Sequence, residues 1–176
     1  MKTIIIVLTV IIGALVLFIG IAALIGSRLP VAHVATRSIL LHRPRPELYQ
    51  LIRDFGSSPT WRSDVKGVDL LGETNGKLRY REHGKQGEVT YEMSEDIPKQ
   101  RIVTTIVDQD LGYSGYWTTV FTTENGGTRV TITENGEVSN VLFRFLSRYV
   151  FGHTSTIDGY LTSLAKHFGE QAVPGD

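Results

Sequence analysis

The chain has 176 residues and no cysteine, and its 18 Lys and Arg side chains are balanced by 18 Asp and Glu. This length suits one domain of ordinary size. The even charge balance argues against a nucleic-acid partner, because that function needs a basic surface. Without cysteine the sequence excludes disulfides, thiolate metal sites and a cysteine nucleophile.

The first element is an uncharged apolar run over residues 4–25, IIIVLTVIIGALVLFIGIAALI. As a helix it rises about 33 Å, which is enough to cross a hydrocarbon core of about 30 Å. The run therefore predicts a transmembrane helix and the membrane as a partner. A removed signal peptide is the alternative, although its apolar centre normally holds only about 7 to 15 residues. We divide the chain into an anchor, residues 1–28, and a domain, residues 29–176.

The side of the membrane on which the domain lies stays open. Arginines follow the run at positions 28, 37, 43 and 45, and this excess of positive charge favours a cytoplasmic domain. An amino-terminal signal anchor would instead place the domain outside. The sequence thus predicts a single-pass membrane protein of open orientation.

Beyond the anchor, the spacing of apolar residues predicts a β protein framed by helices. Residues 33–41 read as a strand, and Pro44 and Pro46 open a helix that runs to about Asp54. A short turn then carries Trp61. Turn residues separate six further strands, at about 65–71, 77–82, 87–95, 100–108, 113–123 and 128–138. We expect an antiparallel meander.

The carboxy-terminal region has a helical period. Asn140 can cap a helix, and an apolar stripe continues through Ile157, Tyr160, Leu161, Leu164 and Phe168. Gly152 and Gly159 together predict a bend in this region. The stripe must be buried, and the meander is the large surface available for it.

Residues 141–151 are denser in large apolar side chains than one buried stripe needs, and Arg144 and Arg148 form a cationic edge. This segment could lie on lipid headgroups beside the anchor, or close the mouth of a cavity. A helix that is buried on most sides is the alternative.

The order of these elements resembles the START-like superfamily, specifically the bacterial SRPBCC proteins of polyketide cyclase/dehydrase-like type. The resemblance is carried by RPELYQLIRDFGSSPTWRSDVKGVDLL (45–71), GGTRVTITENGEV (126–138) and FRFLSRYVFGHTSTIDGYLTSLAKHF (143–168). It implies an α+β, Bet v 1-like helix-grip fold, in which a seven-stranded antiparallel curved sheet surrounds a long C-terminal helix and leaves a cavity. The superfamily includes lipid carriers, cyclases, hormone receptors and chaperone cofactors, so the fold alone does not identify the chemistry.

Alternation along the strands points a set of large side chains inward, where they could line a hydrophobic ligand pocket. The alternative is that these rings fill the core. The expected ligand-binding residues are Trp61, Tyr80, Tyr91, Met93, Trp117, Phe121, Glu134 and Tyr160.

Glu134 is the strongest candidate for a polar residue in the pocket, because it follows Val130 and Ile132 on the inward face. It could bind a polar ligand head or act as an acid or base. A bulge at Asn135-Gly136 would instead turn it toward solvent, and we expect that arrangement. Glu82 raises the same question, and we expect it to be exposed at a strand end.

Our main hypothesis is a membrane-tethered domain that binds a hydrophobic small molecule or lipid without covalent chemistry, metal or cofactor. The second hypothesis is a cyclase or dehydratase in which Glu134, Tyr91 or His153 acts as acid or base. The third is an interaction domain with a filled core. The five histidines are scattered along the chain and do not form a metal-binding motif.

Overall fold

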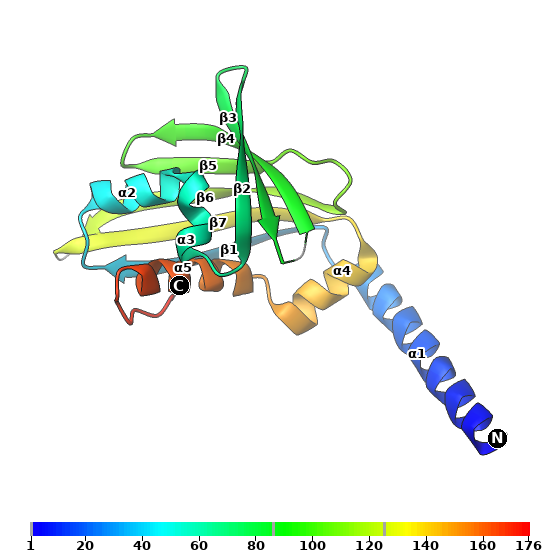
Figure 1. Cartoon of the computed structure of the whole chain (residues 1–176). Coiled ribbons are helices and arrows are strands. Elements are labelled where there is room, and N and C mark those ends of the chain that lie inside the picture. The colour runs from blue at the N-terminus through cyan, green and yellow to red at the C-terminus, as the bar shows by residue number, and fades with distance from the viewer. Residues whose placement is uncertain (1, 86, 125) are drawn as a thin grey trace.

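The computed structural model describes residues 2–85, 87–124 and 126–176 of the chain (Figure 1). Seven strands form one sheet: β1 (Ala32–Leu41), β2 (Val65–Thr74), β3 (Lys77–Gly84), β4 (Gly87–Ile97), β5 (Arg101–Ile106), β6 (Tyr113–Glu124) and β7 (Gly127–Val138). The helices are α1 (Lys2–Arg28), α2 (Arg45–Arg53), α3 (Ser58–Trp61), α4 (Val141–Leu146) and α5 (Ser155–His167). A 3-10 turn, η1 (Phe55–Ser57), precedes α3, and a π-helical segment, η2 (Ser147–Phe151), follows α4.

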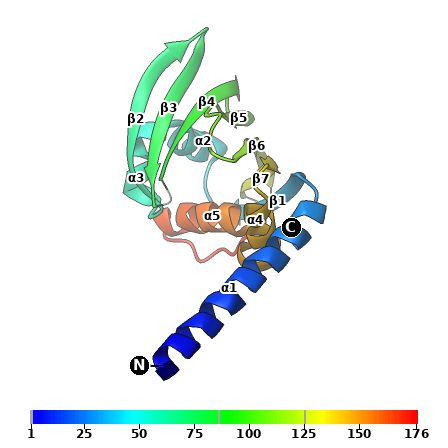
Figure 2. The same cartoon turned by 90° about the vertical axis from the view of Figure 1, so that its right-hand side faces the viewer.

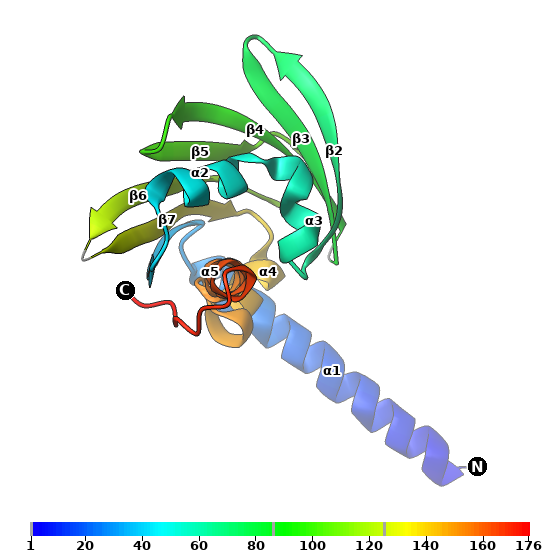
Figure 3. The same cartoon turned by 60° about the vertical axis from the view of Figure 1, so that its left-hand side comes forward.

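The sheet is an antiparallel meander with the spatial order β1-β7-β6-β5-β4-β3-β2. Every neighbouring pair except β1 and β7 is also consecutive in the chain, as the turn residues predict. Register shifts within β2 and between β4 and β5 mark irregularities that bend the sheet. Figure 3 shows the result, a curved sheet that arches over α5 with α2 and α3 inside the arch. The predicted helix-grip architecture is confirmed.

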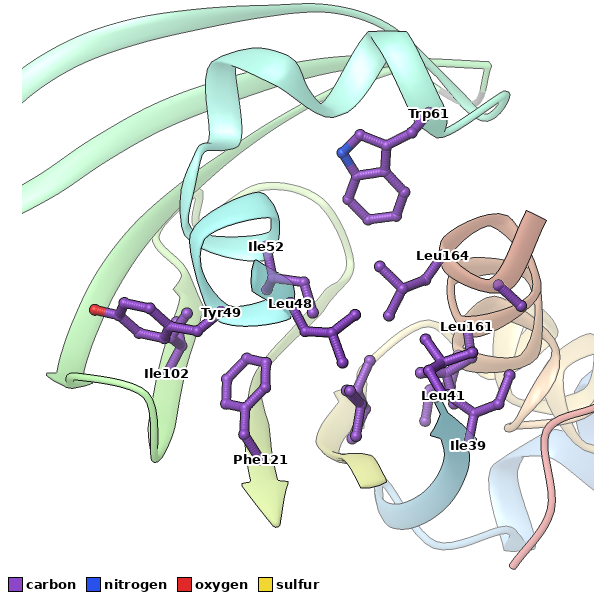
Figure 4. Close-up of a cluster of buried hydrophobic side chains, with 14 of the residues drawn as sticks. Ile39, Leu41, Leu48, Tyr49, Ile52, Trp61, Ile102, Phe121, Leu161 and Leu164 are labelled. Atoms are coloured by element: carbon purple, nitrogen blue, oxygen red, sulfur yellow. The ribbon is translucent and has the colours of Figure 1, made fainter. Parts of the chain in front are cut away.

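One end of the concave face is a sealed hydrophobic core (Figure 4). Alternate residues of β1 and β7 point into it, and one stripe of α5 packs against them. Burial of each such aliphatic side chain contributes about 1.5–3 kcal/mol. Its completely buried members include Ile39, Leu41, Leu48, Val130, Ile132, Ile157, Leu161 and Leu164.

Helix α2 closes this end of the core. Leu48, Tyr49 and Ile52 lie on its inner face and are buried. The Tyr49 ring meets Phe121 edge-on, with 5.9 Å between centroids, and its hydroxyl donates a 2.6 Å hydrogen bond to Asp96 Oδ1. The phenol can therefore be buried without losing a hydrogen bond.

The predicted long C-terminal helix is divided once, and the division lies at Gly152 rather than at Gly159. Gly152 has a φ of 76° and ends η2, because this left-handed backbone cannot continue a helix. Helix α5 then runs through Gly159 without a break. Its buried stripe of Ile157, Leu161 and Leu164 packs on the core, and this packing outweighs the low helix propensity of one glycine.

Helix α1 projects away from the sheet (Figure 2). It is long and apolar enough to cross a membrane, a test that an amino-terminal signal sequence also passes. Its buried residues are Ala22 and Gly26, near the end where α4 lies alongside it (Figure 1).

Candidate functional site

The other end of the concave face carries the aromatic side chains expected to bind ligand. Tyr160 of α5 lies between two tryptophans, with its ring centroid 5.1 Å from that of Trp61 and 5.7 Å from that of Trp117. Both pairs meet edge-on, the arrangement that favours aromatic attraction. Tyr91, Met93, Trp117 and Tyr160 are only partly buried. Trp61 and Tyr80 belong to the same buried core as Leu48 and Leu161, and the four partly buried side chains pack against it.

A stack of rings continues the cluster toward the β2–β4 edge. Tyr80 and Tyr91 are cross-strand partners on β3 and β4, and their centroids are 5.3 Å apart. Phe55 also stacks on Tyr80, with 4.0 Å between the ring centroids. Burial raises the pKa of Tyr80, Tyr91 and Tyr160 above that of a free phenol. These phenols stay protonated at neutral pH and can act as hydrogen-bond donors.

Trp61 combines burial with an unused hydrogen-bond donor. Its side chain extends from α3 toward Leu164 of α5 (Figure 4), and only 9% of its surface is exposed. Within the described residues, its indole N–H has no hydrogen-bond partner. An unpaired buried donor is costly, so an acceptor placed there would be bound favourably.

A buried ion pair lies beside the aromatic rings. Arg62 Nη1 donates a 2.7 Å hydrogen bond to Glu82 Oε1, and the guanidinium carbon is 5.0 Å from the centroid of the Tyr160 ring. Glu82 is buried, so its expected exposure is wrong. The reason is that β3 extends to Gly84, which leaves Glu82 inside the strand and on its inward face.

The electrostatics of this pair follow from its burial. Burial raises the pKa of Glu82 above its ordinary value, although the charge and hydrogen bond of Arg62 oppose that shift. Burial disfavours the charged form of Arg62, but Glu82 and Asp64 outweigh it and raise the Arg62 pKa. Arg62 therefore remains a cation at the edge of the aromatic cluster.

Glu134 lies on the concave face and accepts two hydrogen bonds. Trp117 Nε1 donates to its Oε2 at 2.9 Å, and His33 Nε2 lies 3.0 Å from its Oε1. The bulge expected at Asn135-Gly136 is absent, since β7 pairs with β1 and β6 in continuous register there. Gly136 makes the arrangement possible, because a side chain at that position would overlap the His33 ring.

His153 joins this cluster from the segment before α5. Its ring stacks on His33, with centroids 4.2 Å apart and planes inclined by 24°. Partial burial, reinforced by His33 and Arg148, lowers the His153 pKa below its ordinary value. A neutral imidazole accepts a proton at one ring nitrogen and donates a hydrogen bond from the other, so Glu134, His33 and His153 together form a set that can orient a ligand or take a proton from it.

The structure thus places six of the eight expected ligand-binding residues in this region: Trp61, Tyr80, Tyr91, Trp117, Glu134 and Tyr160. Met93 is partly buried and packs against the hydrophobic core. Phe121 lies in the sealed half against Tyr49 and is 3% exposed, so its contact with a ligand stays a prediction. Sequence reasoning missed His33 and Arg62. A glycine directly opposite His33 in the strand pairing was the available signal for the first of them.

The hollows described on the structure lie outside the aromatic cluster. One of about 390 Å³ is lined by Arg81, Glu88, Thr90 and residues 108–111. The other, of about 450 Å³, lies between α1 and Tyr149 of η2. The rings of the cluster contact one another, so a filled core remains an alternative to a ligand pocket. Within the described part of the chain, no three His, Asp or Glu side chains are placed to hold a metal ion.

Several solved structures share this fold. A START superfamily protein from Mycobacterium smegmatis aligns with 15% identity over 77% of this chain and 96% of its own, with a TM-score of 0.63. The Zhui aromatase/cyclase from Streptomyces sp. R1128 aligns with 11% identity over 77% and 93%, also with a TM-score of 0.63. A protein from Thermobifida fusca aligns with 20% identity over 77% and 93%, with a TM-score of 0.62. Identities this low show a common fold and leave the chemistry open.

The sequence itself identifies the family. No curated protein matches the chain. The family model described as polyketide cyclase / dehydrase and lipid transport matches residues 32–169, which include every strand and α5. The chain therefore belongs to the polyketide cyclase/dehydrase and lipid transport family.

Proposed function

We propose that the protein is a membrane-tethered carrier or receptor that binds a hydrophobic small molecule or lipid without changing it. The observation that carries the proposal is the buried indole N–H of Trp61, which has no partner among the described residues and lies within a cluster of partly exposed rings. The family description includes lipid transport, which supports this class of ligand.

The polar groups define the ligand more closely. Trp61 can donate a hydrogen bond, whereas the carboxylate of Glu134 can accept one. The rings of Trp117 and Tyr160 offer apolar surface. The site therefore suits a flat, mainly apolar molecule that carries a carbonyl or similar acceptor and a hydroxyl donor.

The two tryptophans of the chain, Trp61 and Trp117, both lie in this site, so intrinsic fluorescence reports on it directly. We propose to titrate the full-length protein in phosphatidylcholine nanodiscs with 6-acetyl-2-naphthol, which has one ketone and one hydroxyl. Saturable quenching at one probe per chain is expected. Glu134→Gln should weaken binding about tenfold, because a hydrogen bond to a charged acceptor is lost.

Two controls separate binding from partition into lipid. Glu137→Gln changes an exposed carboxylate on the same strand and should leave the affinity unchanged. 2-Acetylnaphthalene lacks the hydroxyl, so its affinity should not respond to Glu134→Gln. Quenching that rises linearly and is equal in every variant would show that the probe dissolves only in the bilayer, and it would refute the site.

The grouping of Glu134, His33 and His153 favours a second candidate function, acid–base catalysis of ring closure. Each closure of this type forms one carbon–carbon bond and then releases one water. Heptane-2,4,6-trione is a simple test substrate, since a bond between C1 and C6 with loss of one water gives orcinol. Conversion above the buffer rate that is abolished by Glu134→Gln would establish an enzyme. Saturable binding without conversion would support the carrier.

The tether is proposed from the length and composition of α1. Intact-mass measurement of the protein from a membrane fraction tests it. A mass that includes residues 1–28, in material that resists alkaline carbonate extraction, is expected. A mature chain that begins after Ser27 would show that the segment is a removed signal.

A further inference from the structure

Helix α4 and segment η2 present a large exposed apolar surface. Neither element has a buried residue, although most of their side chains are large and apolar. In η2, Tyr149, Val150 and Phe151 are 61%, 61% and 58% exposed. Such a dense group of exposed rings and aliphatic chains marks an interaction surface in the part of the chain that the structure describes.

This surface is joined to α1. The Phe145 ring lies edge-on to Phe18 at 6.2 Å, and Arg144 Nη1 donates a 2.9 Å hydrogen bond to the carbonyl of Leu29. The helices approach closely at Gly26, where a side chain would overlap the carbonyl oxygen of Val141. Figures 1 and 2 both show α4 beside the carboxy-terminal part of α1.

The contact with Phe18 determines the depth of α4 in a membrane. Phe18 precedes Ile25, the last residue of the apolar run, by seven positions, which corresponds to about 10 Å along a helix axis. Amphipathic helices that lie in the membrane interface insert to about 5–10 Å. If α1 crosses the bilayer, α4 is therefore held at the depth of an interfacial helix.

The hollow between the two elements has a matching composition. Its volume is about 450 Å³, and Leu24, Ile25, Leu29 and Tyr149 provide most of its lining, with Arg28 as the charged member. An open apolar hollow with one cation suits a lipid, whose chain would fill it and whose phosphate would meet Arg28. Arg148 is also exposed and can reach headgroups from η2.

We infer that α4 and η2 form a second membrane element, which lies in the plane of the interface against α1 and buries Tyr149, Val150 and Phe151 in lipid. This inference rests on the membrane tether of the proposed function. His153 follows η2 after Gly152 and stacks on His33. The segment in the lipid is therefore followed in the chain by a residue of the candidate site.

The natural absence of cysteine allows a clean test with single-cysteine variants of the full-length protein. The Val150→Cys variant is labelled with an NBD fluorophore and reconstituted in vesicles of phosphatidylcholine and phosphatidylglycerol. Val16→Cys in the middle of α1 reports on the tether, and Glu73→Cys at the exposed end of β2 reports on water. We expect 5-doxyl lipid to quench position 150 at least about twofold more than position 73, and more than 12-doxyl lipid does.

Different failures give different answers. If position 16 is quenched by lipid but position 150 behaves like position 73, the interfacial segment is refuted and the tether stands. If position 16 is also in water, both are refuted. A third outcome is that the probes at position 150 quench one another and are not quenched by spin-labelled lipid. That result would assign the surface to a second copy of the chain, which also overturns the inference.

A pair of glycine variants tests the docking of α4 on α1. Gly26→Val should displace α4 through its overlap with Val141, and the quenching of position 150 by 5-doxyl lipid should then fall at least about twofold. Gly20→Val is the matched control, because nothing lies within 4 Å of a side chain there. Equal quenching in both variants would show that α1 does not position the segment.

Discussion

Arg62 and Glu82 form the most deeply placed ion pair of the candidate site, with side chains only 11% and 10% exposed. Such a pair must offset the cost of removing two charges from water, and it does so here through a 2.7 Å hydrogen bond and a second contact of Arg62 with Asp64. Removal of one partner leaves the other charge buried. The pair is therefore a sensitive point in the stability of this half of the sheet.

We predict that Arg62→Met lowers the free energy of unfolding by about 3–5 kcal/mol, because Glu82 is left buried without its cation. Lys77→Met is the matched control. Lys77 also pairs with a glutamate of the sheet, Glu92, but its side chain is 47% exposed, and the expected loss is below about 1 kcal/mol. Urea unfolding of the full-length protein in detergent, followed by tryptophan fluorescence, measures both. Equal losses would contradict the prediction.

The pKa values of two histidines should differ from the ordinary value of 6.5 in opposite directions. Hydrogen bonds to Asp69 and Glu88 raise the pKa of His83, whereas burial lowers that of His153. Resolved NMR titrations of the ring protons are expected to show His153 losing its proton at lower pH than His83. The reverse order would contradict the described environments.

The sign of each contribution to stability follows from linkage. His83 binds its proton more tightly when folded, so its contribution is complete below pH 6.5 and is lost as pH rises through its higher folded pKa. His153 behaves in the opposite way. Its contribution is present above pH 6.5 and is lost as pH falls through its lower folded pKa.

Among the elements, the C-terminal helices show how one residue type has two effects. Gly152 adopts a φ of 76° and separates η2 from α5. Gly159 lies inside α5, and the space around its α-carbon is open. The same glycine-to-alanine change should therefore act with opposite sign at the two positions.

Gly159→Ala is expected to stabilise the protein by about 0.5–1 kcal/mol, because alanine has the higher helix propensity and meets no neighbour there. Gly152→Ala should destabilise by about 1–2 kcal/mol, since a side chain is unfavourable in left-handed backbone. Thermal unfolding of the two variants beside the wild type measures the difference. A loss of stability in Gly159→Ala would show that α5 needs the glycine for a reason other than its backbone.

At the scale of the whole molecule, α1 is attached to the domain through a small area. The buried residues of α1 are Ala22 and Gly26, and its contacts with the domain are mainly to α4. The sealed core under α2 and α5 contains no residue of α1. The sheet and the helices that it encloses should therefore fold without the amino-terminal helix.

We predict that a chain lacking residues 1–25 still folds, so that its far-ultraviolet circular dichroism differs from that of the full chain by the helical signal of α1. It should self-associate, because the apolar surface of α4 and η2 loses its cover and its lipid. Analytical ultracentrifugation should show oligomers that mild detergent dissociates. Tyr149→Ser with Val150→Ser in the same truncated chain should reduce this association. A monomer at all concentrations would contradict the role assigned to the surface.

Most of the architecture could be predicted because its signals are local. Alternating apolar residues, turn residues and the period of the last helix are properties of neighbouring positions, and the seven strands formed close to their expected bounds. The break at Gly152 and the continuity at Gly159 could not be separated in this way. Their difference depends on how η2 and α5 each pack, which lies outside the local sequence.

In the candidate site, too, the features with local signals could be predicted and the features that depend on distant contacts could not. The inward direction of Tyr80, Tyr91 and Trp117 follows from strand alternation, and these residues do meet Tyr160 or one another. By itself, then, the sequence determined the long apolar first helix, the order of elements and the aromatic lining. Only the tertiary structure decided whether the side chains of Glu82 and Glu134 are buried and which groups they contact. A carboxylate is buried or exposed according to its partners, and the partner His33 lies 101 positions from Glu134 along the chain.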